Sequence, residues 1–147
     1  MMDYRMGQVG GVAVVRLEDN EDIYAAVHEV ARREDIRSAF LVAVGGVRRA
    51  KVVVGPKSPI GPIEPEFREF DDAREAVGVG TLFWDDEGPK MHLHMGLGRG
   101  DETLVGCPRG GAESFCVLEI VILEITGVDA VRALDPALGL KLLTFAT

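Results

Sequence analysis

Residues 89–107 read PKMHLHMGLGRGDETLVGC, and this stretch is the most informative part of the chain for both fold and function. Its first half, Pro89 to Leu97, has the short apolar pattern that is typical of a β-strand. The tetrapeptide Gly98-Arg99-Gly100-Asp101 predicts a tight turn, after which Glu102 to Val105 can return antiparallel. The stretch therefore predicts a β-hairpin.

The first strand of this hairpin contains two histidines, His92 and His94. Because side chains alternate along a strand, both imidazoles should point from the same face. With Arg99-Gly100 at the centre of the turn, His92 would lie opposite Cys107 and share its face. Two imidazole nitrogens and a thiolate suit zinc, and three protein ligands would leave a fourth position for water or substrate.

Other interpretations compete with this metal site. A His-x-His pair also occurs on solvated sheet faces, and Cys107 alone could be an ordinary small apolar residue. Cys116 lies in an apolar run, which indicates core packing. Glu119 lies in the same run, where an unpaired carboxylate would be costly. It is therefore either a metal neighbour or general acid–base group, or it has a structural partner such as Arg132 or an interface.

The N-terminal part predicts a strand followed by a helix. Val12 to Leu17 is short and β-rich, and the acidic residues 18–22 then favour a helix start, with Asp19 or Asn20 as the N-cap. The next apolar residues recur with helical spacing and predict one helix over residues 21–34, approximately: they are Ile23, Ala26, Val27, Val30 and Ala31. His28 falls outside this stripe and is interpreted as a surface residue.

Six further segments have the composition of β-strands. They are Ser38 to Val44, Arg48 to Val54, Phe67 to Phe70, Ala76 to Trp84, Ser114 to Ile125, and Leu140 to Phe145. Gly45-Gly46 permits a turn or bulge between the first two. Prolines at every third position within residues 55–66 predict a stiff surface loop. No linker is evident, so we expect one domain over residues 1–147.

The composition restricts the class of protein. The formal net charge of −8 repels a phosphate backbone, and Arg48, Arg49 and Lys51 are too few to form a basic stripe. Two cysteines in 147 residues give no disulfide framework. The low cysteine content, together with an N-terminus that does not resemble a signal peptide, favours a cytoplasmic protein. No apolar run reaches the roughly 18 residues of a membrane span, so no membrane partner is expected.

Several short motifs follow one another in a distinctive order. They are Arg16-Leu17-Glu18-Asp19-Asn20-Glu21-Asp22, Val44-Gly45-Gly46-Val47, Val79-Gly80-Thr81-Leu82, Met91-His92-Leu93-His94, Val105-Gly106-Cys107, Leu118-Glu119-Ile120-Val121-Ile122, and the ending Arg132 to Leu142. In this order they resemble the plant- and prokaryote-conserved (PPC) domain, a domain of unknown function. The resemblance implies an α+β fold with a mostly antiparallel sheet and one main flanking helix. It also implies similarity to the acetolactate decarboxylase-like fold, and a homotrimer.

The resemblance also bears on function. Prokaryotic members of that family typically have His-x-His and a later Gly-His; His92 and His94 match this pattern, whereas Cys107 occupies the third position. The histidine-bound zinc of acetolactate decarboxylase suggests a zinc-assisted reaction on a small molecule, with Glu119 as the candidate catalytic proton carrier. Plant relatives carry AT-hook segments that bind DNA, but Gly98-Arg99-Gly100-Asp101 lacks the Arg-Gly-Arg-Pro core.

We therefore expect a homotrimeric protein that binds zinc through His92, His94 and Cys107 and has an undetermined activity. A small-molecule ligand is the expected partner besides the chain itself. The alternative is an oligomerisation module with a DNA-related role and no catalysis. A basic surface would favour that alternative, and the negative charge argues against it.

Overall fold

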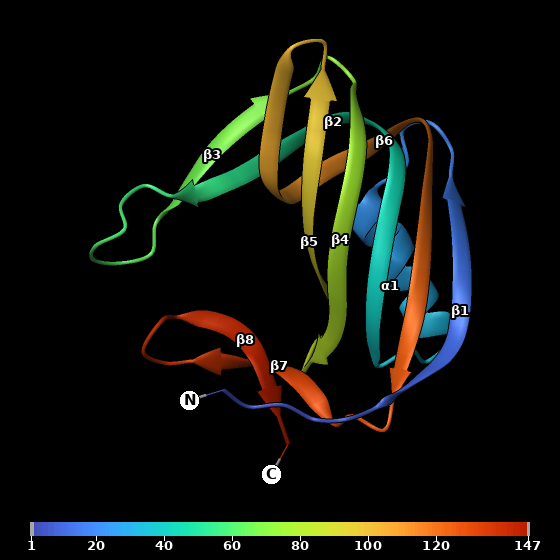
Figure 1. Ribbon diagram of the computed structural model, residues 1–147, viewed down its shortest axis with the longest axis vertical. Coiled ribbons are helices and arrows are strands. Elements are labelled where there is room, and N and C mark those ends of the chain that lie inside the picture. Colours follow the sequence, from blue (N-terminus) through green and yellow to red (C-terminus); the bar gives the residue numbers. More distant parts are fainter. Residues whose placement is uncertain (1, 147) are drawn as a thin grey trace.

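The computed structural model describes residues 2–146, which form one helix and eight strands (Figure 1). In chain order the elements are β1 (Gln8–Leu17), α1 (Ile23–Arg33), β2 (Ser38–Pro56), β3 (Pro65–Phe70), β4 (Arg74–Asp85), β5 (Gly88–Arg99), β6 (Glu102–Thr126), β7 (Ala130–Asp135) and β8 (Leu140–Phe145). The expectation of a mostly antiparallel sheet with a single main helix is confirmed.

The two longest strands, β2 and β6, organise the sheet. β2 pairs antiparallel with β6 on one edge and with β4 on the other. Since β5 joins β4 to β6, these four strands form a closed circuit. β1 extends the sheet along β6, and β3 pairs with the second half of β2. β7 and β8 form a hairpin at the lower end of Figure 1, attached to β4 by the single parallel bridge between Trp84 and Val131.

The helix α1 forms where the acidic stretch predicts it, although its N-cap differs. Asp22 is the N-cap, and its carboxylate accepts a hydrogen bond of 2.8 Å from the Ala25 amide. Asp19, one of the two expected caps, instead pairs with Arg48 and accepts from the Cys116 amide. The apolar stripe buries Ile23, Val27 and Ala31 in the core. No helix in the described residues is long and apolar enough to cross a membrane.

Strand alternation divides the sheet between a core and an outer face. The side chains that point inward are fully buried with the helix; the largest include Leu41, Leu82, Leu93, Met95, Leu118, Ile120 and Ile122. Between them, the alternate residues of β1, β6, β2, β4 and β5 point outward. We call this second surface the outer face.

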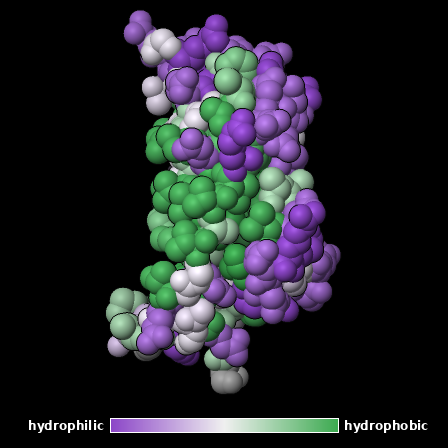
Figure 2. All heavy atoms as spheres, turned by 90° about the vertical axis from the view of Figure 1, so that its right-hand side faces the viewer, coloured by the Kyte–Doolittle hydropathy of each residue, from purple (hydrophilic) through white to green (hydrophobic). Residues whose placement is uncertain are grey.

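The outer face is unusually apolar for an exposed surface. Cross-strand register aligns one row through Val14, Val121, Val42, Val79 and His94. The row next to it runs through Val12, Leu123, Phe40, Thr81 and His92. All four valines of the first row are exposed. Figure 2 shows hydrophobic atoms gathered across the middle of the side on which β1 lies.

The structure differs from the sequence prediction in three elements. Residues 102–105 and 114–125, predicted as two strands, both belong to β6. Residues 38–54 are part of one strand, not two strands around a turn at Gly45-Gly46. Gly45 has a φ of 141°, and a Cβ there would lie 2.4 Å from the Val117 carbonyl oxygen, so glycine allows a bend opposite a bulge in β6. The strand β7 was not predicted, because its short sequence alternates polar and apolar residues only weakly.

Candidate metal centre

The two histidines of β5 face each other on the outer face, at the end of the two rows described above. Their Nε2 atoms lie 3.1 Å apart, with the ring centroids separated by 4.9 Å and the ring planes at 81°. Pairing of Thr81 with His92 and of Val79 with His94 fixes both side chains on one face of β5. The prediction that both imidazoles point from the same face of the strand is therefore confirmed.

Cys107 completes a group of three potential ligands. The nearest ligand atoms of His92, His94 and Cys107 all lie within 4.8 Å of one another, with the histidines exposed and the thiol buried. With zinc–nitrogen distances of about 2.0–2.1 Å, tetrahedral ligation places two imidazole nitrogens about 3.3 Å apart. The observed 3.1 Å separation fits this spacing. The donor set suits zinc and leaves one side open.

The register that brings Cys107 there differs from the predicted one. The turn centres on Gly100-Asp101, so that Gly96 lies opposite Val105 and Met95 opposite Gly106. The predicted turn at Arg99-Gly100 would have paired Met95 with Leu104, so the predicted register was wrong by two residues along β6. Since side chains alternate with a period of two, a slip of two keeps every side chain on the same face. The three ligands therefore still converge.

Gly106 lets β6 change partners next to the thiol. The ladder with β5 ends at Met95 and Gly106, and Cys107 then pairs with Val53 of β2. A Cβ on Gly106 would lie only 2.2 Å from the Val53 carbonyl oxygen, so no larger residue fits without movement of the backbone. This close approach fixes the segment that presents Cys107.

Tyr24 of α1 holds the same segment from the helix side. Its hydroxyl donates a 2.5 Å hydrogen bond to the Pro108 carbonyl oxygen, and the Cys107 thiol lies 3.7 Å from that oxygen. Burial, together with the nearby Cys107, raises the pKa of Tyr24 well above its usual value, so the hydroxyl stays a donor. The sequence analysis missed Tyr24, because only the packed helix brings it to Cys107.

Positive charge surrounds His92 without any compensating acid in the metal group. Burial lowers the pKa of His92 first, and the Arg132, His94 and Arg109 side chains lower it further. The neutral imidazole is thus favoured, and it is the form that binds a metal. Neither arginine was singled out as a partner of the histidines by sequence, since both reach them from distant strands.

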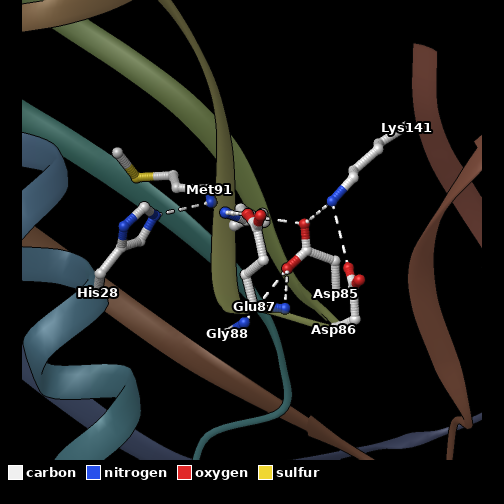
Figure 3. Close-up of polar contacts among 8 residues, drawn as sticks. His28, Asp85, Asp86, Glu87, Gly88, Met91 and Lys141 are labelled. Carbon is white, nitrogen blue, oxygen red and sulfur yellow. Dashed lines mark hydrogen bonds and ion pairs between the residues drawn. The ribbon is translucent and has the colours of Figure 1, made fainter. Parts of the chain in front are cut away.

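His28 is half-buried, which corrects its interpretation as a surface residue. Its Nε2 accepts a 3.0 Å hydrogen bond from the Met91 amide, one residue before His92 (Figure 3). The ladder between β5 and β6 begins only at Met95, so the Met91 amide needs a partner from elsewhere. His28 provides it and ties α1 to β5.

His28 should make stability depend on pH. Burial, then Arg32 and Lys90, lower its pKa below the ordinary value of 6.5. The unfolded chain therefore binds more protons between that value and the folded pKa, so the free energy of unfolding falls as pH drops through this window. We expect urea unfolding of metal-free protein to lose stability from about pH 6.5 downward. In His28→Gln the loss should be smaller, since the amide oxygen can accept from Met91 without titrating. If the wild type and His28→Gln lost the same free energy of unfolding, His28 would not be the group that makes stability depend on pH.

Glu119 and Cys116 are exposed, contrary to the expectation that they lie in an apolar interior. Leu118 and Ile120 take the inward positions, so Glu119 points outward between Arg16 and Val44. It forms no ion pair with Arg132 within residues 2–146. In the sheet, β2 and β4 lie between Glu119 and the histidines of β5, and Glu119 is not in the group whose ligand atoms lie within 4.8 Å of one another. The structure therefore does not bring Glu119 to the metal group.

Cys116 is exposed because β6 bulges there. Its φ is 59°, and the register with β2 shifts between Gly45 and Gly46, opposite Leu118 and Phe115. A bulge leaves one residue outside the ladder and turns its side chain away from the regular alternation. The alternating pattern of the sequence could not show this shift.

Comparison with known proteins agrees with this architecture. The family model for the plants and prokaryotes conserved domain matches residues 4–126. A metal-containing protein from Archaeoglobus fulgidus is similar in structure, with a TM-score of 0.85, 24% identity, and coverage of 97% of this chain and 99% of that one. A plant- and prokaryote-conserved protein from Pyrococcus horikoshii is also similar, with a TM-score of 0.83, 20% identity, and coverage of 99% of each chain.

A candidate DNA-binding protein from Bacteroides thetaiotaomicron has the same fold, with a TM-score of 0.77, 19% identity, and coverage of 96% of this chain and 99% of that one. No curated protein matches the sequence. At these identities the solved structures establish the fold alone, while the family model covers most of the chain. The chain therefore belongs to the plants and prokaryotes conserved domain family.

Proposed function

We propose that this chain is a zinc-binding, homotrimeric protein that acts on or binds a small molecule at His92, His94 and Cys107. The convergence of three ligand atoms within 4.8 Å is the observation that supports this proposal. Soft thiolate and borderline imidazole ligands favour zinc over magnesium or calcium, which prefer oxygen. The similar protein from Archaeoglobus fulgidus is described as metal-containing, which agrees with the proposal.

The proposed site has the ligand count of a catalytic rather than a purely structural zinc centre. Three protein ligands leave one position for water or a substrate oxygen, where zinc polarises a carbonyl group or lowers the pKa of water. The residues of this chain would hold the ion and keep His92 neutral. Glu119 has no part in this proposal, because β2 and β4 lie between it and the histidines.

The homotrimer is proposed from the outer face. Exposed valines and Phe40 form adjoining rows across five strands, and the rows end at the two histidines. A continuous apolar surface of this kind is typical of an interface. We propose that further copies of the chain cover it, because burying these apolar rows would desolvate little charge.

Metal content tests the proposed site directly. Untagged protein, expressed with zinc and dialysed without chelator, should contain about one equivalent of zinc per chain, since each chain supplies all three ligands. Plasma emission spectrometry measures the metal, and amino acid analysis measures the protein. Protein that contains negligible metal, and that takes up none when titrated with zinc, would contradict the proposal and favour an oligomerisation module without metal.

A further inference from the structure

A cavity of about 530 Å³ lies beside His92, between the start of β5 and the β7–β8 hairpin. Its walls include Met91 and His92 of β5, Arg109 of β6, Arg132 of β7, and Leu140 and Leu142 of β8. Cavities of roughly 300–1,000 Å³ hold small organic ligands. The cavity therefore has room for a small molecule next to a proposed metal ligand.

At one end of this cavity both lysines are paired with acids. The buried Asp85 carboxylate accepts from the Lys141 Nζ at 2.6 Å (Figure 3). It also lies 3.7 Å from the Lys90 Nζ. Glu87 pairs with Lys90 at 2.9 Å, and the exposed Asp86 lies 3.2 Å from Lys141. Both lysines are thus engaged by acids of the β4–β5 turn, and this network fastens β8 to the sheet.

The charges at the other end are not neutralised. Arg132 is half-buried, donates to the Thr81 hydroxyl at 3.0 Å and lies over the Phe83 ring at 5.6 Å. Within residues 2–146, neither Arg132 nor Arg109 forms an ion pair, and both line the cavity beside His92. Arg132 is partly out of water without an acid, which is costly and favours an anionic ligand that would replace the lost interactions, while Arg109 is exposed and free to contact the same ligand.

We propose that this cavity binds a small organic anion, with its carboxylate or phosphate group on Arg132 and Arg109 and its apolar part against Leu140 and Leu142. This inference names the ligand class of the site and rests on the proposed function in placing the anion beside the metal. A guanidinium presents paired N–H donors that match the oxygens of either group. The two leucines and Met91 provide the apolar wall that an inorganic ion would not need.

In the proposal the β7–β8 hairpin supplies Arg132 and the apolar wall of the cavity. Arg132, Leu140 and Leu142 all lie beyond residue 126, where the match to the family model ends. The metal ligands lie within the matched segment, whereas these three cavity residues come from a hairpin that is attached through the Trp84–Val131 bridge, the Arg132–Thr81 hydrogen bond and the Lys141 pairs. The proposed anion site thus combines these hairpin residues with Arg109 and His92 of the matched segment.

Isothermal titration calorimetry tests the inference with four probes: butyrate, phenyl phosphate, inorganic phosphate and the neutral butyramide. Each is titrated into the full chain, with and without added zinc. We expect butyrate or phenyl phosphate to bind, and Arg132→Met or Arg109→Met to weaken that binding by about tenfold or more, because each removes a charged hydrogen-bond donor. Arg68→Met, on β3 and paired with Glu66, is the control and should bind like the wild type.

The outcomes separate this inference from the proposed metal site. Stronger binding of butyrate assigns a carboxylate ligand, and stronger binding of phenyl phosphate assigns a phosphate ester; either supports the inference if the arginine variants weaken it. Equal binding of butyramide, unchanged affinity in both arginine variants, or no binding of either organic anion overturns it. Zinc content is measured on the same samples. If the protein binds no zinc, the proposed metal site fails, and the titrations without zinc still show whether the cavity binds the organic anions.

Discussion

Cys107→Ser is expected to lower the affinity of this protein for zinc by more than about 100-fold, because a hydroxyl replaces one of three protein ligands, a thiolate. Loss of a residue that only orients a metal ligand already lowers metal affinity by about 10–100-fold, so loss of a ligand itself should cost more. His92→Ala should have an effect of similar size, since it removes one of the two imidazoles. The measurement is competition for zinc with a chromophoric chelator at pH 7.4, on untagged protein.

Cys116→Ser is the matched control for Cys107→Ser. Both variants lose one thiol from β6, yet Cys116 is exposed at a bulge and lies outside the group of three ligands. Its affinity for zinc should equal that of the wild type. If the two serine variants bound zinc equally well, Cys107 would not be a ligand, and the site would reduce to the histidine pair. Far-ultraviolet circular dichroism shows whether each variant remains folded.

The parts of the fold that depend on local periodicity could be predicted from sequence. Alternation and helical spacing located α1 and the hairpin with the histidines, because burial on one face imposes these periods on local sequence. The ligand group also followed from periodicity, since the two-residue slip in register left Cys107 on the same face. A slip of one residue would have turned it away.

The parts that depend on contacts between distant residues could not be predicted. Glu119 is a different case, because its outward position follows from local alternation with the buried Leu118 and Ile120, and the prediction of an apolar interior overlooked that alternation. Burial of His28 depends on where α1 meets the unpaired edge of β5. Arg132 reaches Thr81 only because β7 attaches beside β4, and no local pattern encodes that bridge.

Val42→Asp is expected to convert the proposed trimer into monomers at micromolar concentration. Val42 lies at the centre of the outer face, between Val121 of β6 and Val79 of β4. In an interface built from this face, each copy would bury an unpaired carboxylate at a cost of several kcal/mol, roughly a 100-fold or greater loss of association per contact. Sedimentation equilibrium measures the mass directly and should give three chains for the wild type and one for the variant.

Ile60→Asp is the matched control, because Ile60 is 84% exposed in the loop between β2 and β3, away from the outer face. It introduces the same charge in place of an aliphatic residue, and it should leave the trimer intact. Val42 is 38% exposed in the single chain, so aspartate there can reach water and should leave the monomer folded. A folded Val42→Asp protein that remains trimeric would show that copies associate through another surface. A wild type that sediments as one chain would leave the apolar rows without their proposed partner.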